Sequence, residues 1–151
     1  MAIGQTLTTS FKVEILDGIH NFGTGVIRAT TAADTFKIAL YTSLSTIDST
    51  TTVYTTDNEV TGTGYTAGGN TLTVSQVPTS TGTETVAWLN FQNSAWPSAT
   101  FSAAGALIYN STQGNKAVAV LNFGGIKTAT NQTFTVTFPA STSSAAIIRI
   151  S

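Results

Sequence analysis

The chain has 151 residues, enough for one domain to bury a core without help from disulfides or metals. Only 9% of the residues are charged, the formal net charge is −1 and cysteine is absent, so the sequence offers no basic surface for nucleic acid, no disulfide and no thiolate nucleophile or ligand. Threonine is the commonest residue and the hydrophobic fraction is 41%, which favours a folded, mainly β protein over a disordered tract.

The N-terminal residues show neither the basic start nor the long apolar run of a signal peptide. No apolar stretch in the chain approaches the ~20 residues of a membrane span. We therefore expect a soluble, unprocessed chain without membrane contact. Residues 1–9 are uncharged and precede the first periodic segment, so we expect an N-terminal arm that is free to leave the remaining domain, residues 10–151.

One helix is predicted, over residues 10–22. Apolar side chains recur there at helical spacing, at Phe11, Ile15, Ile19 and Phe22. Ser10 or the preceding threonine can cap the start, and Gly23 is placed to end the helix. A strand through Phe11, Val13 and Ile15 is the alternative. If the segment is helical, we expect these four apolar side chains to be buried against the rest of the domain.

Downstream, the apolar pattern becomes that of β-strands. The predicted strands cover residues 35–43, 70–77, 83–91, 104–110, 116–124, 132–139 and 145–151. The loop 111–115 is short and contains glycine, so it should join its flanking strands as a hairpin. This series predicts a single-domain antiparallel β-sandwich or jelly roll with one short N-terminal helix. The polar, glycine-rich segment 44–69 is predicted to be a functional or flexible loop with one short strand around Thr52–Thr55.

Part of that segment matches a dinucleotide-binding fingerprint. Gly62, Gly64 and Ala67 fit G-x-G-x-x-A, and the acidic Glu84 follows about twenty residues after them. Such glycines hold a pyrophosphate only where they follow a strand and open a helix, whereas a threonine-rich strand pattern follows here. We therefore expect a connection between strands that depends on glycine, and no cofactor.

No group of residues predicts catalysis or metal binding. His20 is the only histidine, and helical spacing would place it beside Asp17, but no nucleophile motif accompanies the pair, so we expect a packing or capping role. Asp57 and Glu59 share a strand face and could hold a cation, although two oxygen donors are few and solvated loop charges are favoured. The carboxylates are otherwise scattered along the chain: Glu14, Asp17, Asp34, Asp48, Asp57, Glu59 and Glu84. We predict no enzyme, no catalytic residue and no metal site.

Six aromatic residues could instead form a stacking platform for sugars: Tyr41, Tyr54, Tyr65, Trp88, Trp96 and Tyr109. Trp88 lies in an apolar strand pattern and is expected in the core. Trp96 lies in a turn-like segment before a proline, so it is the better candidate for an exposed contact, although core or subunit-interface packing is its favoured role. The glycosylation sequons at Asn110 and Asn131 are expected by chance in a threonine-rich chain.

The wording of several segments resembles a family of small virion proteins of tailed bacteriophages. These segments are, in order, "FKIALYTSLSTID", "NEVTGTGYTAGG", "ALIYN", "KAVAVLNFGG" and "FTVTFP", with "FKVEILDGIHNF" near the start. The likeness runs from about Phe36 to the C-terminus. It implies a β-rich particle component without cofactor or enzymatic residues, on the head as decoration or at the tail or neck.

From this resemblance we expect a capsid decoration or cement protein that bridges shell subunits, as a small homo-oligomer in a virion assembled in the host cytoplasm. Its expected partners are the major capsid protein or tail and neck components, without nucleic acid. The contacts are expected from the arm 1–9 and the loop 44–69. The alternatives are a tail, neck or fibre component, and a receptor- or glycan-binding module that uses Trp96 and Tyr65.

Overall fold

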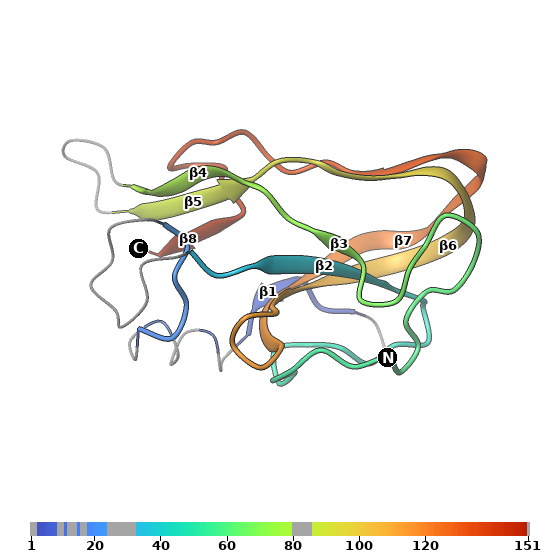
Figure 1. Ribbon diagram of the computed structural model, residues 1–151, viewed down its shortest axis with the longest axis horizontal. Helices are drawn as coiled ribbons and strands as arrows, with labels where there is room; N and C mark the ends of the chain where they lie inside the picture. Colours follow the sequence, from blue (N-terminus) through green and yellow to red (C-terminus); the bar gives the residue numbers. More distant parts are fainter. Residues whose placement is uncertain are drawn as a thin grey trace.

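The computed structural model describes residues 3–8, 11, 15, 18–23, 33–79 and 86–150. Over these residues the protein is mainly β, and its strands form two antiparallel sheets (Figure 1). The strands are β1 (Thr6–Leu7), β2 (Phe36–Tyr41), β3 (Asn70–Thr71), β4 (Val74–Thr79), β5 (Ala87–Phe91), β6 (Ser94–Asn110), β7 (Lys116–Val136) and β8 (Ile148–Ile150). One sheet has the order β1-β7-β6-β2-β3 and the other the order β4-β5-β8, so the prediction of a mainly β, antiparallel protein is confirmed.

A long hairpin, β6 and β7, forms the centre of the fold. Its pairing runs from Asn110 opposite Lys116 to Ser94 opposite Val136. The predicted loop 111–115 closes this hairpin, and the three predicted strands 104–110, 116–124 and 132–139 all fall largely within it. With 17 and 21 residues, β6 and β7 are much longer than the usual strand of roughly 3–10 residues, so they cannot stay flat within a domain of this size.

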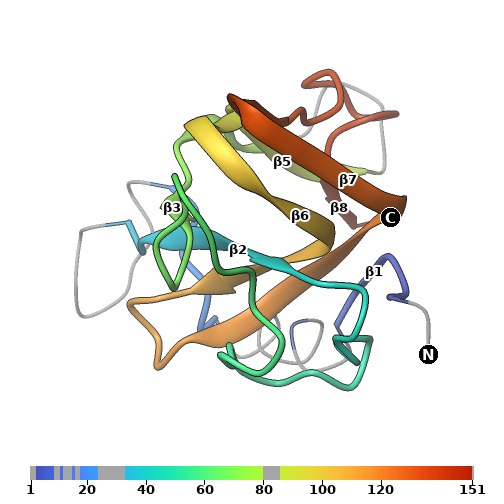
Figure 2. The ribbon, with the colours of Figure 1, turned by 90° about the vertical axis from the view of Figure 1, so that its right-hand side faces the viewer.

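The hairpin bends back on itself at the end of the molecule opposite β4, β5 and β8 (Figure 1), and Figure 2 looks onto this end. The pairing register shifts three times between Trp96 and Gly105, as expected of β-bulges, which bend a strand and increase its twist. In β7, Gly124, Gly125 and Asn131 have positive φ angles of 68°, 133° and 50°. The half of the hairpin next to its loop therefore lies between β1 and β2 in the five-stranded sheet. The other half, which ends at Ser94 and Val136, runs toward β5 (Figure 1).

The central strands are buried on both faces. In β2, Phe36, Ile38 and Leu40 belong to the larger apolar cluster, and Ala39 and Tyr41 belong to a smaller cluster on the opposite face. The strand alternation thus separates two cores. The smaller core is completed by β6 and β7 through Leu107, Tyr109 and Val120, and by Ile3.

Two predicted strands differ from the structure. The strand expected over residues 70–77 is divided into β3 and β4, which belong to different sheets. Between them the buried Leu72 donates its backbone N–H to the carbonyl of Phe36 at 2.8 Å, and the chain crosses from one sheet to the other. The strand expected around Thr52–Thr55 is reduced to a single bridge between Val53 and Lys116.

Six of the thirteen residues of the predicted helix, 10–22, lie outside the described residues. Phe11 and Ile15 have helical backbone, but Gly18 lies in a turn with a φ of 66° and donates its N–H to the Ile15 carbonyl. Residues 19–22 are not helical, so the predicted end of the helix is wrong, because a glycine in the left-handed conformation ends a helix. The predicted burial is confirmed for Phe11 and Phe22, whereas Ile15 and Ile19 are only half-buried. Within the described part of the chain, no helix is long and apolar enough to span a membrane.

The expectation that the arm 1–9 lies outside the core is wrong for residues 3–8. β1 pairs with β7, placing Thr6 opposite Val120, and Ile3 is only 5% exposed. Gly105 provides the physical reason, because a Cβ at this position would lie 2.7 Å from Ile3 Cδ1 and 2.6 Å from the Leu121 carbonyl oxygen. The missing side chain leaves the space that Ile3 fills.

We predict that Ile3→Ala lowers the free energy of unfolding by about 2–5 kcal/mol, because it removes a buried side chain and leaves a cavity. Ile126→Ala is the matched control: Ile126 is 61% exposed, so its truncation should change stability by no more than about 0.5 kcal/mol. Urea unfolding of both variants measures the difference. Equal stability of the two variants would contradict the assignment of the N-terminal segment to the core.

Candidate functional site

All four tyrosines of the chain surround one buried carboxylate, that of Glu59. Glu59 is 8% exposed. Its Oε1 accepts hydrogen bonds from the Tyr65 hydroxyl at 2.6 Å and the Gly68 N–H at 2.7 Å, and its Oε2 accepts one from the Tyr54 hydroxyl at 2.6 Å. We call Glu59 and the four tyrosines the Glu59 cluster.

The other two tyrosines bind the backbone of the same segment. The Tyr41 hydroxyl, at the end of β2, donates to the Thr55 carbonyl at 2.6 Å, and the Tyr109 hydroxyl, on β6, donates to the Gly68 carbonyl at 2.8 Å. Tyr65 also accepts the backbone N–H of Leu40 at 2.9 Å. The cluster therefore ties the segment 54–69 to both β2 and β6, although the sequence predicted a flexible loop there.

Burial of the hydroxyls and the nearby charge of Glu59 raise the pKa of every tyrosine in the cluster. For Tyr109, burial is the larger cause and the pKa rises to about 12. The pKa values of Tyr41, Tyr54 and Tyr65 rise as well, first through burial and then through the charge of Glu59 or the hydrogen bond to it. The tyrosine hydroxyls thus stay protonated at neutral pH and can donate hydrogen bonds.

The carboxylate of the cluster is occupied by hydrogen bonds rather than open to a metal ion. Asp57, the suggested cation partner of Glu59, is exposed, whereas Glu59 is buried and already accepts three hydrogen bonds. Among the described residues, no group of three or more acidic, histidine or cysteine side chains could hold a metal ion. The expectation that both are solvated loop charges is therefore wrong for Glu59, which is buried and hydrogen-bonded, and agrees with the exposure of Asp57.

The glycine-rich stretch connects strands, as its sequence context predicted. The residues after it form β3 rather than a helix, and Thr63 pairs with Thr100 of β6. A Cβ on Gly62 would lie 2.5 Å from the Thr100 carbonyl oxygen, and one on Gly69 would overlap the carbonyl of Ile38. These glycines thus allow close backbone packing against β6 and β2, which is the reason for their presence. Glu84, the acidic residue of the fingerprint, lies outside the described residues.

His20 packs among aromatic rings, as expected. Its ring lies 4.9 Å from that of Phe11, and its Nδ1 is 3.1 Å from the side-chain nitrogen of Asn110. Asn110 also donates to Asp34 Oδ2 at 2.8 Å. Asn110 is fully buried by these contacts, so its sequon serves packing. Asp17, the partner first suggested for His20, lies outside the described residues.

Neither tryptophan offers a stacking surface. Trp88 is 7% exposed, which confirms its place in the core, and Trp96 is 2% exposed. The preference for Trp96 as an exposed contact is wrong, because the turn-like sequence around it lies in β6, where its ring lies 6.2 Å from that of Tyr65 and 6.1 Å from that of Phe134. Core packing, the favoured role of Trp96, is confirmed. The indole N–H groups of both tryptophans are buried and have no hydrogen-bond partner among the described residues.

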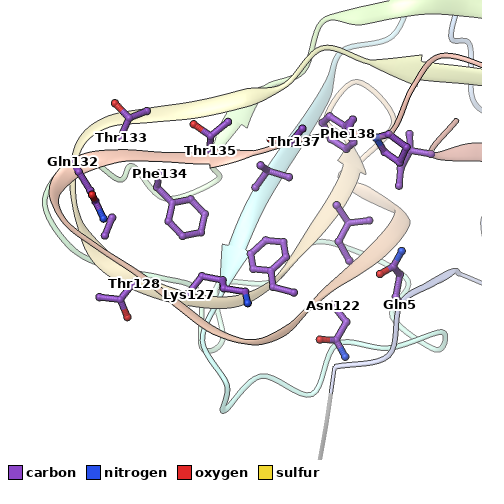
Figure 3. A pocket seen from close by; sticks show the side chains of 16 residues that line it. Gln5, Asn122, Lys127, Thr128, Gln132, Thr133, Phe134, Thr135, Thr137 and Phe138 are labelled. Atoms are coloured by element: carbon purple, nitrogen blue, oxygen red, sulfur yellow. The ribbon is translucent and has the colours of Figure 1, made fainter. Parts of the chain in front are cut away.

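A groove of about 520 Å³ opens along the concave side of the bent β7 (Figure 3). Phe134 and Phe138 line it from one side of the bend, and Leu121 and Phe123 line it from the other. We call it the β7 groove. Sequence patterns did not predict this groove, because it depends on the bend.

Comparisons with known protein families, with curated proteins and with solved structures found no match for this chain.

We predict that the four tyrosines resist alkaline titration together. An unfolded tyrosine ionises near its ordinary pKa of 10.0, but the folded pKa values are all raised, so the folding stability that depends on these groups is complete below pH 10 and is lost as pH rises through the folded values. Ultraviolet absorbance of tyrosinate should therefore appear only above the ordinary range, with a loss of structure. Glu59→Gln should move this titration to lower pH, and Asp57→Asn should leave it unchanged. Ordinary titration of the wild-type tyrosines would contradict the cluster.

A second prediction compares two glycines with nearly the same backbone angle. Gly69 has a φ of 66° and Gly114 a φ of 64°, but only Gly69 has backbone atoms in the space of a Cβ. Gly114→Ala should cost about 1–2 kcal/mol of unfolding free energy, the ordinary penalty of the left-handed conformation. Gly69→Ala should cost clearly more, because β2 must also move. Chemical denaturation of both variants measures the difference, and equal losses would argue against the close packing on Ile38.

Proposed function

We propose that this protein is a non-enzymatic structural protein of a tailed-bacteriophage virion, and specifically a decoration or cement protein that bridges neighbouring capsid subunits. The resemblance of segments such as "FKIALYTSLSTID" and "KAVAVLNFGG" to small virion proteins is the sequence basis of this proposal. On this proposal the protein acts in the virion, after assembly in the host cytoplasm, as a small homo-oligomer. Its partners are the major capsid protein or, on the second alternative, tail and neck components.

The Glu59 cluster is the structural observation that supports this proposal best. The only buried carboxylate among the described acidic residues is used to fix a surface segment, and its oxygens face hydrogen-bond donors instead of an open site. A protein that bridges a shell needs surfaces of defined shape, because a flexible loop loses conformational entropy on binding. The cluster supplies such a surface over residues 54–69.

The surface composition is also consistent with packing between subunits. β7 presents threonines to solvent near the bend: Thr128, Thr130, Thr133 and Thr135 are all exposed. Leu44, in the segment 44–69, is 76% exposed. Neutral surfaces of this kind lose little solvation energy when they are buried against another protein. A contact of the proposed type should bury on the order of 1,000 Å² or more in total.

We also propose a more specific description of the fold. Two antiparallel sheets connected by the bent β6–β7 hairpin are consistent with a single β-sandwich or jelly-roll-like domain over residues 10–151, together with the N-terminal strand β1. The glycan-binding alternative loses its main residue, because Trp96 is buried and the Tyr65 hydroxyl is bound to Glu59. A tail, neck or fibre position remains the second candidate.

Purified particles test this proposal. Quantitative mass spectrometry should find the protein at a copy number comparable to that of the major capsid protein, and imaging should place it on the shell. A copy number far below that of the shell subunit would favour a tail or neck position instead. Absence from the particle would show the proposal to be wrong.

Two variants test the expected contact through the segment 44–69. Leu44→Ser should reduce incorporation into particles, because it removes an exposed apolar contact, without changing thermal stability. Val77→Ser is the control, since Val77 is 51% exposed and lies on β4, outside this segment. Equal incorporation of the two variants would remove Leu44 from the contact.

A further inference from the structure

The β7 groove has the size and lining of a binding site. Its volume of about 520 Å³ lies within the range of about 300–1,000 Å³ that is typical of ligand sites. Its interior is apolar, formed by Leu121, Phe123, Phe134, Val136 and Phe138. Polar side chains stand at its margins, among them Gln5, Asn122 and Gln132, as the close-up shows (Figure 3).

One edge of β7 borders this groove. On one side β7 pairs with β6 from Lys116 to Asn122 and again from Lys127 to Val136. On the other side, β1 pairs with it at Ala119 and Val120, and the side-chain amide of Asn122 reaches the Ile3 carbonyl. Within the described part of the chain, no strand pairs with this edge from Phe123 to Val136. An open strand edge presents backbone N–H and C=O groups that another extended chain can pair with.

The same edge is already used for strand addition by the chain itself. β1 is a short N-terminal strand that joins the edge of β7, and Gln5, which precedes it directly, lines the groove. The open part of the edge is thus continuous with an interface that the fold forms internally. Beyond the bend, Gln132–Val136 is a straight stretch of this edge, paired with β6 on its inner side.

The side chains on this stretch define what a partner strand would present. Phe134 and Val136 are buried and form the apolar interior of the groove, whereas Thr133 and Thr135, which also line it, are exposed. In a sheet, side chains at equivalent alternate positions of adjacent strands point to the same face. A strand added beside Gln132–Val136 would therefore direct every second side chain into the apolar groove and the others to solvent.

The charge of the groove adds a second requirement. Lys127 is the only charged residue that lines it, and it is exposed near the bend. No acidic side chain among the lining residues compensates this charge. A partner that carries a carboxylate near the bend would be favoured over a neutral or basic partner.

We propose that the β7 groove binds an extended segment of another protein, with apolar side chains at alternate positions and an acidic residue facing Lys127, which adds as a strand to the edge at Gln132–Val136. A hydrocarbon chain could also fill an apolar groove beside a lysine, but it cannot pair with the backbone groups of the edge. The open edge thus favours a peptide. This inference does not depend on the virion proposal, since it concerns the edge and the groove alone.

Selection from a random library of peptides of about 12 residues, displayed against the full-length protein, tests the proposal. Enriched sequences should alternate apolar and polar residues and carry Asp or Glu toward one end. With synthetic versions of these peptides, Lys127→Glu should weaken binding about fivefold, and exchanging the peptide acid for lysine should restore it. Lys116→Glu is the matched control, because Lys116 lies on the same strand but does not line the groove. Hydrogen exchange should slow at Gln132–Val136 when the peptide is bound.

Five results would overturn the proposal. The first is the absence of enriched peptides, and the second is binding that Lys127→Glu and Lys116→Glu affect equally. The third is peptide binding without slower exchange at Gln132–Val136, which would place the peptide elsewhere. The fourth is binding of dodecanoate in the groove without any peptide binding, which would make the groove a lipid site. Self-association of the protein that buries this edge and blocks peptides would assign the groove to a second copy instead, and so would also contradict it.

Discussion

The requirement to hydrogen-bond the buried Glu59 carboxylate organises this fold. A carboxylate removed from water costs several kcal/mol unless donors replace the lost hydration. Here the donors are two tyrosine hydroxyls and one backbone N–H, all from residues within ten positions of Glu59. The remaining tyrosines, Tyr41 and Tyr109, bind the backbone of the same segment from β2 and β6. Movement of this segment away from the sheet would break the hydrogen bonds of Leu40, Tyr41 and Tyr109 to it and open the cluster to water, so the cluster keeps a long connection in one conformation.

The bend of the β6–β7 hairpin is supported by the segment that the cluster fixes. Thr63 pairs with Thr100, and Gly64 lies so close to the chain around Pro97 and Ala99 that a Cβ there would be 3.0 Å from either of them. The bulges and positive φ angles permit the bend, and the packed segment restrains its outer strand. The β7 groove exists because the hairpin is bent. The Glu59 carboxylate thus fixes the segment 54–69, this segment restrains the bend of the hairpin, and the bend forms the β7 groove.

Local patterns predicted the parts of this fold that depend on near neighbours. The alternation in β2 and the short loop 111–115 were sufficient to predict a strand and a hairpin. The length of β6 was not predicted, because Pro97 and Ser98 are typical of a turn and are accommodated in this strand by a bulge. The role of Glu59 could not be predicted from the sequence either, since two tyrosines of the cluster, Tyr41 and Tyr109, belong to strands that are distant from Glu59 in the sequence. The short spacing between Tyr54, Glu59 and Tyr65, next to the glycine-rich stretch, was the one signal in the sequence from which the cluster could have been predicted.

The distribution of charge determines how this protein can recognise a partner. With its buried carboxylate fully hydrogen-bonded, and with a surface rich in threonine, the described part of the molecule has few groups for long-range electrostatic attraction. Recognition must then depend on shape and on backbone hydrogen bonds, which act only at contact. Slow association is the expected consequence, and an assembly that holds many copies close together would compensate for it through a high local concentration. Lys127 is the exception within the β7 groove, and a single charge at such a site orients a partner more than it attracts one.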